Sequence, residues 1–420
     1  MTGKNEPILL GKLDLRSAGP RCKMLLGDIN GDGRMEIVMI QPDDRQDVRY
    51  IPHQVQCVTA FDLLGNLLWQ TGTPSNTAGG PGSDYPAQIY DLDDDGQLEV
   101  LCVMNDRFCL LNGATGELKS SHELPGSQAH DCIIIANLSG GKRPSDVILK
   151  DRYHRLWAMD NNFNLLWKHD GNPGHFPWAF DLNGDGRDEV MAGYDLLDPK
   201  GQLLWSCKDL DDHADCIWVG DVNGDGRPEL VIGGSVTVMY DRSGHELWRY
   251  DGSVESQHVA LGKFRDDLPG LQIAGLDRIV RGDTGEMFTQ SGKDALFLLD
   301  GAGKEIWKED RTTDGWLTII ETLSGWDDSG LDYILAYRRG GGVNPTLYDG
   351  HMQSVTTFPF EGYVVHGDLL GVDSEQVIIY DNETACIFAS QHQDLTVTTG
   401  TPLPQVKRLY SSTLYPGGEV

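Results

Sequence analysis

Short apolar stretches alternate with acidic, glycine-rich loops along the whole of this sequence. The segment GDINGDGRMEIVMI at residues 27–40 is one instance, in which a loop of Asp, Asn and Gly precedes a strand-length apolar run. Sharp copies of it begin near residues 90, 180 and 220, and weaker copies begin near residues 135, 261, 321 and 366. Helical periodicity is nearly absent, so the pattern predicts short β-strands joined by tight turns.

A second signature lies between these copies, namely a turn followed by a strand that ends in Trp. It reads GNLLW at 65–69, FNLLW at 163–167, GQLLW at 201–205, GHELW at 244–248 and GKEIW at 303–307. Each unit therefore predicts four strands, and the units recur mostly every 40–46 residues. A four-stranded unit at this period is typical of an all-β fold, the β-propeller, with the Trp side chains packed between blades.

The number of copies predicts the number of blades. Eight copies predict eight blades, and seven is the alternative if one weak copy is an insertion. The last unit, residues 361–391, supplies only three strands, so the unassigned segment EPILLGKLDL at 6–15 is expected to complete it and close the ring. We expect one propeller domain over residues 1–391 and a C-terminal extension, residues 392–420, packed on it.

Charge and composition narrow the classes of partner. The chain has 64 Asp+Glu against 34 Lys+Arg, a net charge of -30, which disfavours nucleic acid and anionic lipid. Most of the eight Cys lie in apolar runs without a CxxC pair, which favours buried thiols in a reducing compartment. The first residues lack the pattern of a secretory signal. We therefore expect a cytoplasmic monomer, or a secreted protein whose leader has been removed.

The sharp acidic loops predict calcium sites. In DxNGDGxxE the oxygen-bearing side chains alternate, Gly permits the sharp turn, and a carboxylate follows, as in a calcium loop. The spacing resembles the loops of integrin-type and bacterial FG-GAP propellers, which implies structural Ca²⁺ at several blades. The weak copies at 138–142 and 263–267 have lost ligands and are expected to be metal-free. The predicted ligands are Asp28, Asn30, Asp32, Glu36, Asp91, Asp93, Asp95, Glu99, Asp181, Asn183, Asp185, Glu189, Asp221, Asn223, Asp225 and Glu229.

The face opposite these loops carries the candidate chemistry. It collects the start of the first strand and the end of the second strand of every blade. Four consecutive blades begin with His, at His130, His175, His213 and His258. The other aromatic and basic residues expected on this face are Tyr85, Arg107, Lys150, Arg152, Tyr153, Tyr194, Arg278, Trp316, Arg338 and Tyr363. Such a cluster on one face of a strongly acidic protein predicts a binding or catalytic site.

The residue types favour elimination over other reactions. The sequence has no GxSxG, HExxH or P-loop motif. Six carboxylates near the face could serve a glycosidase, but nothing selects one pair among Asp106, Asp131, Asp151, Asp195, Asp215 and Asp277. Cations that bind a uronate carboxylate, with His and Tyr to move protons, suit β-elimination next to that carboxylate.

The loops and strand-ending Trp residues resemble those of rhamnogalacturonan lyases, which are eight-bladed. They also resemble ulvan lyases and rhamnose–glucuronate lyases or rhamnosidases, which are seven-bladed. The most specific stretch is residues 130–234, with HDCIII, KDRYHRLWAMD, HFPWAFDLNGDG and HADCIWVGDVNGDG at the blade spacing. The resemblance implies a lyase of rhamnose- and uronate-containing plant or algal cell-wall glycans. Those lyases are mostly exported, whereas this chain shows no leader.

The resemblance also implies His, Tyr and Arg as the catalytic types. We expect His130 and His175 to flank the sugar, Arg152 to bind its carboxylate, and Tyr153 or Tyr194 to complete proton transfer. In the alternative, His213 and His258 are the working pair. Two other functions stay open, a non-catalytic FG-GAP module that binds a glycan or a protein on this face, and a His-dependent rhamnosidase.

Overall fold

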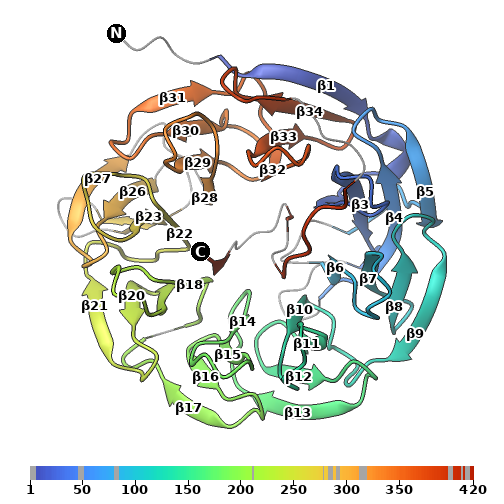
Figure 1. Ribbon diagram of the computed structural model, residues 1–420, viewed down its shortest axis with the longest axis horizontal. Helices are drawn as coiled ribbons and strands as arrows, with labels where there is room; N and C mark the ends of the chain where they lie inside the picture. The colour runs from blue at the N-terminus through green and yellow to red at the C-terminus, as the bar shows by residue number, and fades with distance from the viewer. Residues whose placement is uncertain are drawn as a thin grey trace.

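The chain folds as a ring of eight β-sheets around a central axis (Figure 1). This computed structural model describes residues 6–45, 52–79, 85–210, 212–277, 279–281, 287–289, 294–311, 319–395, 401–407, 410–411 and 417–420. The four strands of each blade are antiparallel, with the first nearest the axis and the last at the rim, and one further strand pairs parallel with the innermost strand of the fifth blade. The predicted all-β, eight-bladed propeller is therefore confirmed.

The first four blades follow the chain without interruption. Their strands are β2 (Lys23–Gly27), β3 (Glu36–Pro42), β4 (Val55–Phe61) and β5 (Leu67–Gly72) in blade 1; β6 (Ala87–Tyr90), β7 (Glu99–Met104), β8 (Arg107–Asn112) and β9 (Leu118–Glu123) in blade 2; β10 (Ile133–Ala136), β11 (Asp146–Lys150), β12 (Arg155–Met159) and β13 (Leu165–Asp170) in blade 3; and β14 (Trp178–Phe180), β15 (Glu189–Ala192), β16 (Asp195–Leu197) and β17 (Leu203–Ser206) in blade 4.

Blades 5 to 8 include one inserted hairpin and two strands from the chain ends. Their strands are β18 (Cys216–Gly220), β19 (Glu229–Gly233), β20 (Thr237–Tyr240), β21 (Glu246–Tyr250) and β35 (Gly418–Glu419) in blade 5; β22 (His258–Gly262), β23 (Gln272–Asp277), β26 (Asp294–Leu299) and β27 (Glu305–Arg311) in blade 6, with the hairpin β24 (Ile279–Arg281) and β25 (Met287–Thr289) inserted; β28 (Ile319–Leu323), β29 (Tyr333–Tyr337), β30 (Thr346–Tyr348) and β31 (Ser354–Thr357) in blade 7; and β32 (Tyr363–Gly367), β33 (Gln376–Tyr380), β34 (Thr384–Ala389) and β1 (Ile8–Asp14) in blade 8.

The N-terminal strand closes the ring, as predicted from segment 6–15. β1 pairs antiparallel with β34, for example Leu9 with Phe388 and Asp14 with Thr384. A short 3₁₀ helix (Arg16–Ala18) then leads the chain into blade 1. Because the first strand of the chain completes the last blade, the sheet of blade 8 is not left one strand short.

The core lies between the blades. Buried apolar side chains among the described residues form seven clusters that cover the eight blade-to-blade contacts, one cluster spanning blades 3, 4 and 5, which follows from strands that are apolar on both faces. Trp178 and Trp218 on innermost strands are 5% and 7% exposed and belong to two of these clusters. Every Cys lies in the described part of the chain as a free thiol, and all but Cys207 are buried.

Four of the five strand-ending Trp side chains donate a hydrogen bond to the next blade. The indole Nε1 of Trp69 donates to the carbonyl oxygen of Gly113 in blade 2 at 2.7 Å. Gly116 of that blade has φ +71°, and a Cβ there would lie 2.4 Å from the Trp69 ring. Glycine is therefore required twice over, for its backbone conformation and for the space beneath the indole. Trp167, Trp205 and Trp248 donate to the following blade in the same way, over Gly201, Gly244 and Gly303.

The two faces of the ring differ in what they carry. The loops that join the first strand to the second strand of each blade lie on one face, which we call the acidic-loop face. The loops that join the second strand to the third, and those that lead into the next blade, lie on the opposite face, which we call the site face. The described C-terminal residues are 401–407, 410–411 and 417–420; among them the Leu403 N–H donates to Asp28 on the acidic-loop face at 2.9 Å, and β35 pairs with β18. In Figure 1 this segment runs through the centre of the ring. Within the described ranges no helix is long and apolar enough to cross a membrane.

Candidate active site

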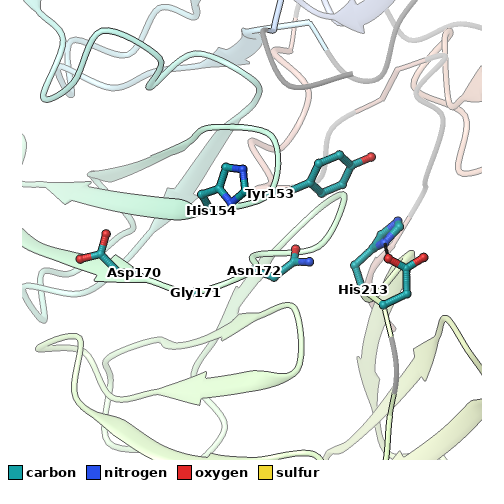
Figure 2. Close-up of a pocket in the computed structure, with 7 residues that line it drawn as sticks. Tyr153, His154, Asp170, Gly171, Asn172 and His213 are labelled. Atoms are coloured by element: carbon teal, nitrogen blue, oxygen red, sulfur yellow. Dashed lines mark ion pairs between the residues drawn. The ribbon is translucent and has the colours of Figure 1, made fainter. Parts of the chain in front are cut away.

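A pocket of about 580 Å³ opens on the site face between blades 3, 4 and 5. Figure 2 shows the side chains that line it, with Asp170 toward one end and His213 toward the other. They come from three loops that join strands on this face, namely β11 to β12, β13 to β14 and β17 to β18. The lining residues are Tyr153, His154, Asp170, Gly171, Asn172, Asp212 and His213.

Two of the four predicted histidines meet beside this pocket. The Nε2 atoms of His175 and His213 lie 2.9 Å apart, so one ring donates a hydrogen bond to the other. Oδ1 of Asp215 lies 3.6 Å from His175 Nε2 and 3.7 Å from His213 Nε2. Asp212 lies 2.7 Å from His213 Nδ1 and holds the outer edge of that ring. His213 is thus fixed by a carboxylate on one nitrogen and by a second imidazole on the other.

Tyr153 packs against both imidazoles. Its ring centroid lies 5.1 Å from that of His213 and 5.6 Å from that of His175, the second contact being edge-on. Tyr194 supports the pair from behind, because its hydroxyl donates to the backbone carbonyl of His213 at 2.9 Å. Burial raises the pKa of Tyr194 to about 12, so this phenol stays protonated near neutral pH.

Behind the histidines lies a buried ion cluster. Asp131 pairs with the ammonium of Lys150 and with Arg152, whose Nε lies 3.2 Å from its Oδ1. Asp131 and Lys150 are 0% exposed and Arg152 is 4% exposed. Together the three groups carry one net positive charge. Burial, then His213, Lys150 and Arg152, hold the pKa of His175 well below its usual range, so His175 is neutral near pH 7.

His130 lies apart from this pair. Its Nδ1 is 3.3 Å from the backbone carbonyl oxygen of His53, it is 1% exposed, and burial lowers its pKa. His53 in turn contacts Asp43 at 2.9 Å and the ring of Tyr85 at 5.9 Å between centroids. Asp43, His53, Tyr85 and His130 therefore form a second polar cluster, which the sequence pattern did not separate from the first.

The remaining predicted residues are spread around the ring. Arg107 begins β8 and donates to Ser121. His258 begins β22, is 2% exposed and adds to the positive potential at His175. Arg338 lies after β29 and Tyr363 stacks on Tyr380 at 5.4 Å, both across the ring from the pocket. Arg278 and Trp316 lie outside the described residues.

The sequence analysis did not select several residues that lie in the pocket or behind it. Asp131 and Asp215 were only two of six carboxylates near the face, and His154, Asn172 and Asp212 were not selected at all. The sequence does contain a pattern that could have selected Asp131 and Asp215. Asp131 directly follows His130, and Asp215 follows His213 after one intervening residue. His154 and Asn172 line the pocket only because their loops converge, which no spacing within one loop reveals.

Two kinds of donor set could hold a metal. One ligand atom each from His175, His213 and Asp215 lie within 4.8 Å of one another, an imidazole and carboxylate set suited to a divalent cation. The acidic loops are the second kind. In blade 1, Asp28 accepts from the backbone N–H of Asp32 and Gly33, and Glu36 accepts from Ile29 and from the Asn30 amide.

Electrostatic repulsion among the carboxylates of these loops favours the binding of a cation. Burial, with the charges of Asp32 and Asp28, raises the pKa of Glu36 to about 8. Glu189 rises to a pKa of about 7 from burial and from Asp185 and Asp181, and the pKa of Glu229 rises in the same way. A divalent ion among these oxygens would relieve the repulsion. The blade 2 loop differs, because the ammonium of Lys119 lies within 2.8 Å of three of its carboxylates.

Known proteins share this architecture. No protein-family profile matches the chain. It is 26% identical to rhamnogalacturonan exolyase YesX of Bacillus subtilis (strain 168) over 43% of this chain and 39% of that protein, and 23% identical to rhamnogalacturonan endolyase YesW of the same organism over 43% and 38%. The matched sequence thus spans about two fifths of either curated relative.

Solved structures extend the likeness over nearly the whole chain. The exotype lyase YesX superposes with a TM-score of 0.68 at 18% identity, covering 97% of this chain and 81% of that one. The V. cholerae biofilm matrix protein Bap1 superposes with a TM-score of 0.61 at 14% identity, covering 96% and 90%. The likeness in sequence falls on the two lyases. The chain is therefore an eight-bladed β-propeller that is similar in sequence and in fold to rhamnogalacturonan lyases.

Proposed function

We propose that this propeller is a polysaccharide lyase that cleaves a rhamnose- and uronate-containing glycan by β-elimination at the uronic acid. The observation that carries the proposal is the His175–His213 contact at 2.9 Å, beside a pocket of about 580 Å³ and against Tyr153. Likeness to a rhamnogalacturonan exolyase and endolyase supports a glycan of the rhamnogalacturonan type as substrate.

Positive charge beside the pocket would make the substrate more acidic. The proton to be removed is on the carbon next to the uronate carboxylate, and a nearby cation lowers the barrier by stabilising the charge that develops. In the whole chain acidic residues outnumber basic ones, yet Lys150 and Arg152 share the single carboxylate of Asp131 here. Arg152 is the group proposed to face the uronate, while the fully buried Lys150 acts through its field.

His213 is the base that the geometry favours among the four histidines. Asp212 accepts a hydrogen bond from Nδ1–H, which leaves the lone pair of His213 on Nε2. In the free site that lone pair accepts a hydrogen bond from neutral His175, and the substrate proton would take the place of this hydrogen bond. The base takes the proton from C5, that electron pair forms the C4–C5 double bond, and the bond from C4 to the leaving oxygen breaks. Tyr153, in contact with both rings, would return a proton to that oxygen, and Tyr194 orients His213 through its backbone carbonyl.

The same three side chains, His175, His213 and Asp215, also fit a divalent cation. Such an ion would supply a positive charge for the uronate carboxylate in addition to that of Arg152. Proton removal would then fall to Tyr153, since both imidazoles would have given up their Nε2 lone pairs. Inhibition by a chelator, with the propeller still folded, separates this arrangement from the metal-free one.

Calcium is proposed as a structural ion on the acidic-loop face, remote from this chemistry. The raised pKa values of Glu36, Glu189 and Glu229 support a cation in the loops of blades 1, 4 and 5. Binding to the native state alone stabilises it by RT ln(1 + [L]/Kd), about 2.7 kcal/mol at a ligand concentration of 100 Kd.

A non-catalytic glycan-binding module is the second candidate, favoured by the likeness to the matrix protein Bap1. A rhamnosidase that uses the same histidines is the third. Incubation with rhamnogalacturonan, ulvan and gum arabic separates the three. Elimination yields an unsaturated uronate that absorbs ultraviolet light, hydrolysis yields new reducing ends without that absorbance, and a binding module yields neither. Absence of the absorbance with all three glycans would sink the lyase proposal.

A further inference from the structure

The calcium loop of blade 2 contains a basic side chain that its sequence motif does not reveal. Nζ of Lys119 lies 2.7 Å from Asp93, 2.7 Å from Asp95 and 2.8 Å from Glu99. Burial works against the charge of Lys119, but its hydrogen bonds to these carboxylates outweigh burial and raise its pKa. The ammonium therefore occupies the position among the carboxylate oxygens that a bound cation would take.

The position of Lys119 in its strand explains why it reaches the loop. In blade 2, β8 and β9 are interrupted by a bulge, so Leu111 pairs with Leu118, Leu110 pairs with Ser120, and Lys119 is skipped. The same bulge recurs on the rim strands of other blades. The skipped residue is leucine in four of them, namely Leu68, Leu166, Leu204 and Leu247, which are 41%, 42%, 51% and 44% exposed, and it is Ile306 in blade 6 and Val355 in blade 7. Blade 2 alone among these seven places a cation at that position.

The loop itself also differs from the other three sharp copies. Blades 1, 4 and 5 carry Asn at the third position, and in each the Asn amide donates to the closing Glu. Blade 2 carries Asp93 there, which adds a carboxylate where the others have a neutral donor. Arg143 of the neighbouring blade also contacts this loop, with Nε 2.7 Å from Asp94. The extra acid and the two basic side chains belong to one cluster, in which five carboxylates face two cations.

A second blade uses a lysine in a related way. At the first loop position of blade 6, Lys263 replaces the usual Asp, and its Nζ donates to the carbonyl oxygens of Leu268 and Gly270 at 2.6 and 2.9 Å. That loop has lost the first and the closing carboxylate, to Lys263 and Gln272, and its Asp267 pairs with Arg265, whereas blade 2 has kept all of its carboxylates. An ammonium is thus an available substitute for a metal ion in this ring.

We propose that Lys119 is the permanent cation of the blade 2 loop, so that this loop, although complete in sequence, takes no calcium in the native protein. The inference rests on the calcium proposal for the other loops. Of the four sharp loops, Lys119 fills the one in blade 2. We therefore expect three calcium ions per chain, in the loops of blades 1, 4 and 5.

The test is the number of calcium ions bound per chain, measured by equilibrium dialysis and elemental analysis. Lys119→Leu restores the residue of the other blades and should raise the count from three to four, while the melting temperature in chelator falls. Leu247→Lys brings an ammonium to blade 5 and should lower the count to two. Leu166→Lys is the matched control, because blade 3 has a weak loop, and it should leave the count at three.

The numbers of calcium ions bound distinguish a failure of the Lys119 proposal from a failure of the calcium proposal. The role of Lys119 would be overturned if the wild type binds four calcium ions. It would also be overturned if neither Lys119→Leu nor Leu247→Lys changes the number of calcium ions bound. Either result would leave the calcium proposal for the other loops unchanged. No calcium in any of the four proteins would overturn both. If Lys119→Leu does not fold, Leu247→Lys against Leu166→Lys still decides, because only the first should lose an ion.

Discussion

At the scale of single residues, the site is a set of buried or half-buried groups that hold one another in place. His213 is the member most directly at the pocket, since Asp212, His175 and Tyr153 all contact it. His245, by contrast, lies in a turn with its side chain 79% exposed and pairs only with its neighbour Asp241 among described contacts. These two histidines make a matched pair for mutagenesis.

His213→Ala should lower turnover on rhamnogalacturonan by about 10²- to 10⁴-fold, because it removes a positioned proton acceptor. The melting temperature should change little, since the side chain borders the pocket. Initial rates from ultraviolet absorbance, with melts alongside, measure both. His245→Ala should match the wild type, and equal rates for the two variants would remove His213 from the mechanism.

Asp131→Asn should destabilise the protein by about 3–5 kcal/mol, because it leaves the buried Lys150 and Arg152 without their shared carboxylate. Denaturant unfolding measures the loss. Adding Lys150→Met should recover part of it, since one of the two stranded charges is then gone. A double variant no more stable than Asp131→Asn would show that the two groups are not energetically coupled.

At the scale of the strand and loop, repetition made the structure predictable. Eight copies of one pattern indicated eight blades, and the strand-ending Trp indicated the contacts between blades, because each repeats a local rule. The pairing of His175 with His213 could not be derived in the same way, since it depends on the lengths of two loops. Lys119 was missed for a related reason: it lies 20 residues beyond Glu99 and reaches the loop only through a bulge in the rim strand.

Without calcium, the acidic loops should make stability fall as pH rises. Folding raises the pKa of Glu36 from its ordinary 4.5 to about 8 and that of Glu189 to about 7. A raised carboxyl pKa stabilises the fold below the ordinary value, and that stability is lost as pH passes through the folded value. Melting temperatures in chelator should therefore fall between pH 5 and pH 8.

Excess calcium should weaken this dependence, because the ion compensates the charge that deprotonation creates. Glu36→Gln should also weaken it in chelator, by removing one of the titrating groups. A melting temperature in chelator that rises steadily over this pH range would contradict the assignment of raised pKa values to the loops.

At the scale of the whole molecule, the C-terminal segment ties blades together that are distant around the ring. Lys407 donates to the carbonyl oxygen of Ala179 at 2.8 Å and pairs with Asp188 at 3.2 Å, both in blade 4. The backbone N–H of Leu26 in blade 1 donates to Tyr410, and that of Val420 donates to Val219 in blade 5. These contacts all lie away from the proposed catalytic pocket.

Lys407→Met should therefore lower stability and spare catalysis. It removes the partner of Asp188, a buried carboxylate that keeps its hydrogen bond from the Asn137 N–H, and the expected cost is about 1–3 kcal/mol. Thermal melts and initial rates on the same sample test both parts. A variant that melts normally but turns over slowly would place the segment in the mechanism.

Ring closure by β1 has a consequence for how the protein is made. β1 is synthesised before blades 1 to 7, whereas its partner β34 is synthesised after them, and Leu9 pairs with Phe388 between the two strands. During synthesis the half-exposed apolar residues Ile8, Leu9 and Leu10 therefore stay on an unpaired strand while seven blades form. The nascent chain should depend on a holdase that binds β1, and stalled chains that end before residue 384 should stay sensitive to protease at β1.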